Sequence, residues 1–330
     1  MRSKYASLFL ILVSFASCAS IKKSAIRSLA DMLSSPDGAG VFTSDDDPKL
    51  IADSMPLALK LYEILLSYDP DNAGLAASTG RNFVMYSGAF VQMPADMLSD
   101  EHWREGVAAR RRAKKLYRRG RDYLLQSLEL RHEGFLHALE SGDYDEAMMR
   151  LEKEDALSAY WGGLAWLGMA VTDPLDMELS TSLDKALLLL YRAMELEETN
   201  PGIHSVMIQI QLSLPSALIL TMRERSPNTA AYMDQYYRDV GVSEEARKRA
   251  FYHYYRALSL SKNQDPGPHI TMATAVSVKE QDAEGFKDYL EKALAIEPDA
   301  DPETRLMVIL YQGRAQWLLE NIESFFLDIH

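Results

Sequence analysis

Apolar residues recur at steps of three and four along almost the whole chain from Pro48 onward. This spacing places them on one face of an α-helix, and the strict alternation of a half-buried strand is nowhere sustained. The run Asp45-Asp46-Asp47-Pro48 marks a helix start, because Asp caps free N–H groups and Pro suits the first turn. The pattern predicts an all-α region over 48–330. It is preceded by an 18–47 tether with one short helix at 26–33.

A weak internal repeat appears when the ends of these helices are aligned. Five segments share an aromatic residue or Leu followed by an aliphatic or small residue three positions later: 61–70, 123–131, 190–198, 254–262 and 290–298. Seven positions before that second residue stand Ala58, Gly120, Ala186, Ala250 and Phe286. Four of these five side chains are small, as the close packing of two antiparallel helices requires.

This pattern resembles the second helix of a tetratricopeptide repeat (TPR), which carries a small residue, an aromatic or Leu, an Ala and a Pro at fixed steps. The Pro occurs only at Pro70 and Pro298, and a first-helix signature survives only in Trp161-Gly162-Gly163-Leu164-Ala165. The separations of 62, 66, 64 and 36 residues show that only the last is near the usual period of about 34 residues. Insertions or extra hairpins therefore separate the other repeats.

We expect one all-α domain of stacked antiparallel hairpins that resemble degenerate TPRs, built as an α-solenoid or a helical bundle. The predicted pairs lie near 72–131, 156–198, 201–261 and 266–297, and a closing helix runs from 302 to about 319. Stacking of such hairpins leaves a concave or central surface that is able to bind a partner or ligand.

The first residues are typical of an export signal. Met1-Arg2-Ser3-Lys4 is positive, and the apolar run 5–15 is too short to span a bilayer. Ser14-Phe15-Ala16-Ser17 then resembles the lipobox that precedes the lipidated cysteine of bacterial lipoproteins, although Leu is usual where Ser14 stands. We predict a lipoprotein signal over 1–17 and a lipid anchor on Cys18; an ordinary secretory signal is the alternative. Both place the protein outside the cytoplasm, and the first places it in the periplasm on a membrane.

Cys18 is the single cysteine of the sequence, so the mature chain has no internal disulfide and no thiol nucleophile. Acidic residues outnumber basic ones by 48 to 35, and the pI is near 5.1. An acidic chain is a poor candidate for binding nucleic acid. The hydrophobic share of 47% is enough for one sizeable core.

A basic stretch interrupts this acidic background. Eight positive charges fall between Arg110 and Arg121, and they cannot share one face of a helix. Two interpretations stay open: a solvated helix, or a docking patch for an acidic partner or phospholipid headgroups. The residues proposed for docking are Arg110, Arg111, Lys114, Lys115 and Arg118.

The sequence offers no convincing catalytic or metal site, and we predict neither an enzyme nor a cofactor. His132-Glu133-Gly134-Phe135-Leu136-His137 resembles the zinc-protease motif HExxH, but its histidines are five apart. On a helix they point about 140° away from each other and cannot ligate one metal together. Glycine-rich phosphate loops and a nucleophile elbow are absent from the sequence.

Two apolar segments are candidates for a ligand cavity. The segment 160–169 mixes large rings with glycines, and 206–222 has no charged residue and contains Pro215, which is expected to kink its helix. Each segment is read either as packed core or as the wall of a cavity, lumen or subunit interface. The proposed cavity residues are Tyr160, Trp161, Trp166, Met207 and Ile210.

Taken together, the lipobox, the acidic exported chain, the worn TPR hairpins and the segment from Tyr160 to Trp166 resemble TatT, the T component that accompanies tripartite ATP-independent periplasmic (TRAP) transporters. The resemblance implies a periplasmic lipoprotein that assembles with itself as a homotrimer and binds the solute-binding P component. It also implies a hydrophobic cavity that passes an apolar or amphipathic small molecule to that partner. The alternative is a protein-only TPR scaffold of the bacterial envelope, in which the apolar segments are packed core and the groove is polar.

Overall fold

A computed structural model describes residues 28–29, 32 and 36–327, and within this part of the chain no strand occurs. The predictions of a signal peptide over 1–17, of the lipid anchor Cys18 and of most of the helix at 26–33 lie outside the described residues. The helices of the main array are α2 (Pro36–Thr43), α3 (Pro48–Tyr68), α4 (Ala73–Tyr86), α6 (Trp103–Arg131), α9 (Ala156–Thr172), α11 (Leu183–Leu196), α12 (Pro201–Ser213), α15 (Ala246–Leu260), α18 (Ala283–Leu294) and α19 (Arg305–Glu320). The all-α prediction is confirmed.

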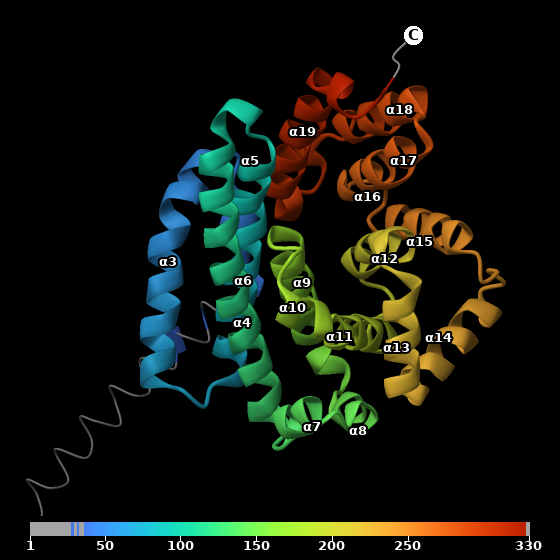
Figure 1. Ribbon diagram of the computed structural model, residues 1–330. Helices are drawn as coiled ribbons and strands as arrows, with labels where there is room; N and C mark the ends of the chain where they lie inside the picture. Colours follow the sequence, from blue (N-terminus) through green and yellow to red (C-terminus); the bar gives the residue numbers. More distant parts are fainter. Residues whose placement is uncertain (1–27, 30–31, 33–35, 328–330) are drawn as a thin grey trace, which may run out of the picture.

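The helices stack in the order of the sequence, as Figure 1 shows. α4 packs on α6, α6 on α9 and α9 on α11, and further along the chain α12 packs on α15. The last predicted pair is formed by α18 with a broken helix that contains α16 (Gly267–Met272), η4 (Ala273–Ser277) and α17 (Val278–Glu280). α19 follows as the predicted closing helix. The hairpin boundaries predicted from the repeat agree with these pairs.

Additional helices account for the uneven repeat spacing. α7 (Phe135–Ser141) and α8 (Tyr144–Arg150) lie between α6 and α9. α13 (Ser216–Arg225) and α14 (Pro227–Asp239) lie between α12 and α15, and α10 (Met177–Thr181) lies between α9 and α11. The predicted extra helices are therefore present.

Small residues bring the helices together where the repeat places them. A Cβ atom added to Gly120 of α6 would lie 2.7 Å from Val84 Cγ2 and 2.9 Å from the Gly80 carbonyl oxygen of α4. A Cβ atom added to Gly163 of α9 would lie 3.0 Å from the carbonyl oxygen of Ala186 on α11. Any larger side chain would force these backbones apart.

The segment before α3 contains more structure than the tether prediction described. α3 begins at Pro48 as predicted, and the Asp47 carboxylate accepts hydrogen bonds from the backbone N–H groups of Lys49 and Leu50. α2 lies within the predicted tether and contacts α19. Arg305 Nη1 of α19 also donates to the Ser44 carbonyl oxygen at 3.0 Å. The two ends of the helical array therefore meet.

Pro215 divides the uncharged segment into two helices rather than kinking one. α12 and α13 meet at an angle of 116°. Proline removes one backbone donor and clashes with the preceding turn, which ends α12 at Ser213. Among the described residues, no single helix has the length and apolar composition of a membrane span, and this bent pair meets the same criteria only when its two helices are taken together.

Candidate functional site

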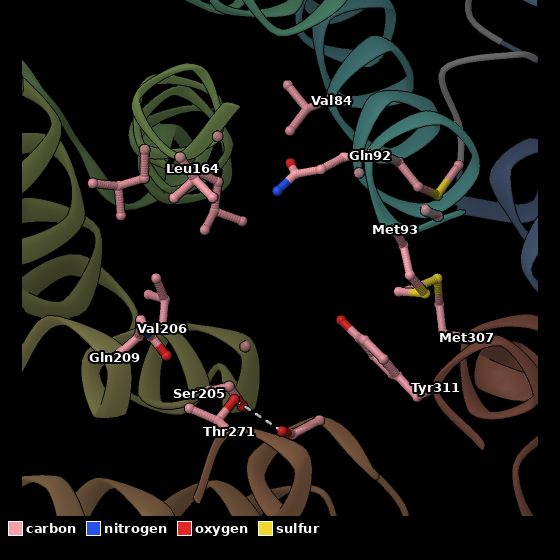
Figure 2. A pocket seen from close by; sticks show the side chains of 18 of the residues that line it. Val84, Gln92, Met93, Leu164, Ser205, Val206, Gln209, Thr271, Met307 and Tyr311 are labelled. Carbon is pink, nitrogen blue, oxygen red and sulfur yellow. Dashed lines mark hydrogen bonds between the residues drawn. The ribbon is translucent and has the colours of Figure 1, made fainter. Parts of the chain in front are cut away.

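The inner faces of six helical segments line a cavity of about 520 Å³. The segments are α4 with its continuations η1 (Ser87–Gln92) and α5 (Met93–Asp96), α6, α9, α12, α16 with η4, and α19. Figure 2 shows Leu164 and Val206 from one side facing Met93, Met307 and Tyr311 from the other. Most of the wall is apolar, as is typical of sites for small organic molecules.

Two of these segments are π-helical, and both border the cavity. η1 contributes Gly88, Ala89 and Gln92, and η4 contributes Thr274. A π-helical turn contains one residue more than an α-helical turn, so it shifts the side chains that follow, and such turns are frequent at functional sites. The backbone irregularities of α4 and α16 thus coincide with the cavity.

Tyr117 of α6 supports the wall from behind. Its hydroxyl donates to Gln92 Oε1 at 2.7 Å. A Cβ atom at Gly88 would lie 3.0 Å from this hydroxyl, and a Cβ atom at Gly168 would lie 2.6 Å from the ring. The two glycines therefore make room for the Tyr117 ring, and the ring fixes the amide of Gln92.

A second cavity of about 820 Å³ adjoins the first. Six residues line both cavities: Tyr160, Trp161, Gly202, Asp265, Met307 and Tyr311. Gly202 lets one of the rings approach closely. A Cβ atom at Gly202 would lie 2.7 Å from Tyr160 Oη. A Cβ atom at Gly267 would lie 3.0 Å from Asp265 Oδ1 and in ordinary contact with the Tyr311 ring. We call these six residues the junction.

The polar groups of the wall fall into two kinds. Gln92 is held by Tyr117 and donates to Asp96 Oδ2 at 3.3 Å, and Thr271 Oγ1 donates to the Gly267 carbonyl oxygen at 3.0 Å. Tyr311 and Arg314, in contrast, have no hydrogen-bond or ion-pair partner within the described part of the chain. These side chains are available to a bound molecule.

Asp265 is the acidic group of the junction. Its Oδ1 accepts the backbone N–H of Gly267 at 2.8 Å. Burial raises the pKa of the Asp265 carboxyl, and this hydrogen bond opposes the shift. Burial, together with the charge of Asp265, also raises the pKa of Tyr311 to about 12, and burial raises that of Tyr160. Both phenols therefore stay neutral at physiological pH.

The structure brings together only part of the predicted cavity set. Tyr160 and Trp161 lie at the junction, as the cavity interpretation of 160–169 requires. Trp166 does not line either cavity, which corrects its prediction. It lies five residues after Trp161, about 140° around the helix, and only 5% of it is exposed. Its Nε1 donates to Ser182 Oγ at 3.1 Å.

Met207 and Ile210 also belong to the core rather than to the cavity wall, and their prediction is corrected. On α12 the cavity is faced by Gly202, Ser205, Val206 and Gln209. The uncharged composition of 206–222 thus indicated the helix but not its face. Nothing in the sequence singled out Met307, Tyr311 or Asp265, since they reach the cavity only through the return of α19 and α16.

The basic stretch lies on α6 and divides into paired and unpaired charges. Arg110 pairs with Asp96 at 3.3 Å, and Lys114 pairs with Asp173 at 2.6 Å and Asp176 at 2.5 Å. The remaining predicted docking residues, Arg111, Lys115 and Arg118, are exposed and form no ion pair with a described residue. Because they stand at i, i+4 and i+7, they share one face of α6. We call these three residues the basic stripe.

The histidines of 132–137 lie apart. His132 Nε2 is 2.6 Å from Oδ2 of the buried Asp155, while His137 is exposed on α7. Among residues 36–327 there is no group of three or more His, Cys, Asp or Glu side chains placed to hold a metal ion. His132 therefore has a structural partner.

Comparison with known proteins assigns the family. The model of a family described as TRAP transporter T-component matches residues 44–218 and 244–326. The unmatched residues 219–243 contain most of α13 and all of α14. The chain is also 32% identical over 347 residues to a protein of Treponema pallidum (strain Nichols) described as uncharacterized, and the match covers 98% of this chain and 100% of that protein. The chain therefore belongs to the TRAP transporter T-component family.

Proposed function

We propose that this T component is a periplasmic lipoprotein, anchored through Cys18, that docks the solute-binding P component and passes it an apolar or amphipathic small molecule through the two joined cavities. The family makes it an accessory component of TRAP transporters on their periplasmic side. A lipid anchor would hold the cavities close to the membrane-embedded part of the transporter, which receives the solute.

The observation that carries this proposal is the pair of cavities that share the junction. Their volumes of about 520 and 820 Å³ lie in the range of small-molecule pockets. The wall of the first cavity is built mainly from Met, Leu, Val and aromatic side chains. A protein-only scaffold is expected to have a polar groove instead, so the apolar wall favours ligand transfer.

The basic stripe supports docking of an acidic partner. Arg111, Lys115 and Arg118 are exposed along one face of α6, in a chain whose formal net charge is −13. Unpaired charges of one sign steer a partner of opposite sign and orient it. We therefore place the P component on this face.

A stripe on α3 supports self-association. Leu50, Leu57, Leu61, Ile64 and Tyr68 are each 48% to 67% exposed. Together with Ser54 they follow alternating steps of four and three residues, the spacing by which one helix packs along another in a coiled coil. We call these residues the α3 stripe and propose that it packs on a second copy of the chain within a homotrimer.

The test uses the purified mature chain, a neutral naphthylamine dye that fluoresces in apolar surroundings, and the purified P component. Val206→Glu places a charge in the cavity wall, and Leu175→Glu places one on a loop residue that is 88% exposed. We expect dye binding to be lost only in Val206→Glu, while P-component binding and the melting temperature stay near those of the wild type. Dye binding unaffected by Val206→Glu would contradict ligand passage. P-component binding by a wild-type chain that takes up no dye would favour the scaffold.

A further inference from the structure

The junction gathers polar and aromatic groups at the place where the two cavities meet. It combines one carboxylate, Asp265, with three aromatic side chains, Tyr160, Trp161 and Tyr311. A molecule that moves from one cavity to the other must pass these four side chains. The chemistry of the junction therefore selects what the cavities accept.

Asp265 is a carboxylate without a cation. It is half-buried in the loop before α16, and its single described hydrogen bond comes from the backbone of Gly267. No lysine or arginine of the described residues lies within ion-pair distance of it. By contrast, Asp96 of the first cavity is paired with Arg110. Because a partly desolvated carboxylate is unfavourable without a counter-ion, a cation in the cavity would be stabilised there.

The rings around Asp265 suit the same kind of ligand. Tyr160 and Trp161 meet edge to face, with ring centroids 5.4 Å apart. Tyr311 approaches the junction from α19, and Figure 2 shows its hydroxyl pointing into the cavity. Neutral aromatic faces attract ammonium groups, and the attraction grows when water is excluded.

Arg314 and Lys262, the cations of the walls, each line only one cavity, so neither belongs to the junction. Arg314 follows Tyr311 by three residues on α19 and lines only the first cavity, and Lys262 lines only the second. A positive charge in the first cavity disfavours an ammonium group there. It thus orients a cationic ligand with its head at the junction and its apolar part along Leu164 and Val206.

We propose that the junction binds the ammonium head of an amphipathic amine, with Asp265 as its counter-ion and Tyr160, Trp161 and Tyr311 around it. This inference rests on the proposed function, because it assumes that the cavities accept a small molecule. The inference adds that this small molecule carries a positive charge.

The experiment compares three probes of equal chain length, decyltrimethylammonium, decanol and decanoate, below their micellar concentrations and by calorimetry on the mature chain. The ammonium probe is expected to bind most tightly. Asp265→Asn is expected to weaken its binding about tenfold or more without changing that of decanol. The matched control is Asp301→Asn, which removes a charge from the second cavity but keeps the side chain that accepts the Glu303 N–H. It should change ammonium binding by no more than about twofold.

Tyr311→Leu serves as a second variant should Asp265→Asn fail to fold. It removes a ring, keeps the carboxylate, and is expected to weaken only the ammonium probe, by about fivefold. Tighter binding of decanoate, lost in Arg314→Gln, would overturn the proposal in favour of an anion site. Equal affinity for all three probes would also overturn it while leaving an apolar cavity intact. Binding of none of the probes would instead count against the proposed function itself.

Discussion

The Nδ1 atoms of His204 and His253 lie 2.9 Å apart in the core and are joined by one hydrogen bond. His204 Nε2 lies 2.8 Å from the Glu198 carbonyl oxygen, which only accepts, so this nitrogen carries the proton and His204 Nδ1 accepts. His253 Nδ1 is then the donor, and its Nε2 accepts from the Tyr237 hydroxyl at 2.9 Å. Gln211 Nε2 donates to the same hydroxyl at 3.1 Å. Each side chain in this series of hydrogen bonds is neutral, and each group donates to the next from Gln211 to the Glu198 carbonyl oxygen.

The histidine pair predicts a loss of stability in mild acid. Burial lowers the pKa of both imidazoles, and for His253 the neighbouring His204 adds to the effect. Below about pH 6.5 the unfolded chain binds protons that the folded chain does not, so the free energy of unfolding falls as pH falls. Each buried His contributes a slope of up to about 1.4 kcal/mol per pH unit. Burial also lowers the pKa of His269 to about 4, so His269 adds to the slope.

Urea unfolding between pH 5.0 and 7.5 measures this slope. His253→Gln should flatten it, since an amide at this position cannot be protonated in that range. His137→Gln, at an exposed position, is the matched control. A slope that is the same in the wild type and both variants would contradict the assignment.

Gly120→Ala should destabilise the fold by roughly 1–3 kcal/mol, because the added methyl group meets Val84 and the Gly80 backbone. Gly313→Ala is the control from the interior of α19, where a Cβ atom meets nothing within 4 Å. It should stabilise by about 0.5–1 kcal/mol, since Ala is the better helix former. Chemical denaturation gives both values. Equal changes in the two variants would contradict the close crossing of α4 and α6.

Charge reversal of the basic stripe should weaken docking. Arg111→Glu with Lys115→Glu is expected to lower the affinity for the P component at low salt, mainly through slower association. The effect should shrink as salt is added, because exposed charges are screened. Lys279→Glu with Lys287→Glu, exposed positions on α17 and α18, is the control. Surface plasmon resonance at two salt concentrations separates the variants, and an unchanged affinity at low salt would refute the docking face.

Charges placed in the α3 stripe should dissociate the assembly. Leu61→Glu with Ile64→Glu replaces two exposed apolar side chains with carboxylates that cannot be desolvated cheaply in a helix–helix interface. Light scattering after size exclusion should then report a monomer with wild-type helicity. Leu175→Glu is the exposed control. A monomeric wild type, or an assembly that survives the double change, would contradict the proposal.

The sequence indicated the helices and their crossings better than the cavity. Gly120 and Ala186 stand at repeat positions whose small side chains predict a close helix crossing, and the structure places both residues at such crossings. On α12, a shift of one residue decides whether a side chain lines the cavity or is buried in the core. Val206 faces the cavity, whereas Met207, the next residue and about 100° further round α12, is fully buried in the core. The most apolar residues were therefore the wrong choice for the wall.

Other parts of the site left no local signal. The π-helical turns η1 and η4 lie in segments whose apolar spacing predicts a helix but not its type. Lys114 finds Asp173 and Asp176 some sixty residues later in the chain, so its pairing is a product of the fold. Separating the paired from the unpaired charges of α6 required three-dimensional coordinates.

The return of α19 to the beginning of the array sets an order of assembly. α19 supplies Met307, Tyr311 and Arg314 to the cavity and contacts α2 and α3 at the far end of the sequence. During synthesis from the N-terminus, every hairpin of the array is made before α19. Until α19 is made, the aromatic side chains of α9 are uncovered on the side that α19 later faces. A polypeptide that ends before Arg305 lacks these three side chains, so the wall of its first cavity is incomplete. Uptake of a ligand therefore reports the completion of folding more strictly than helical content does.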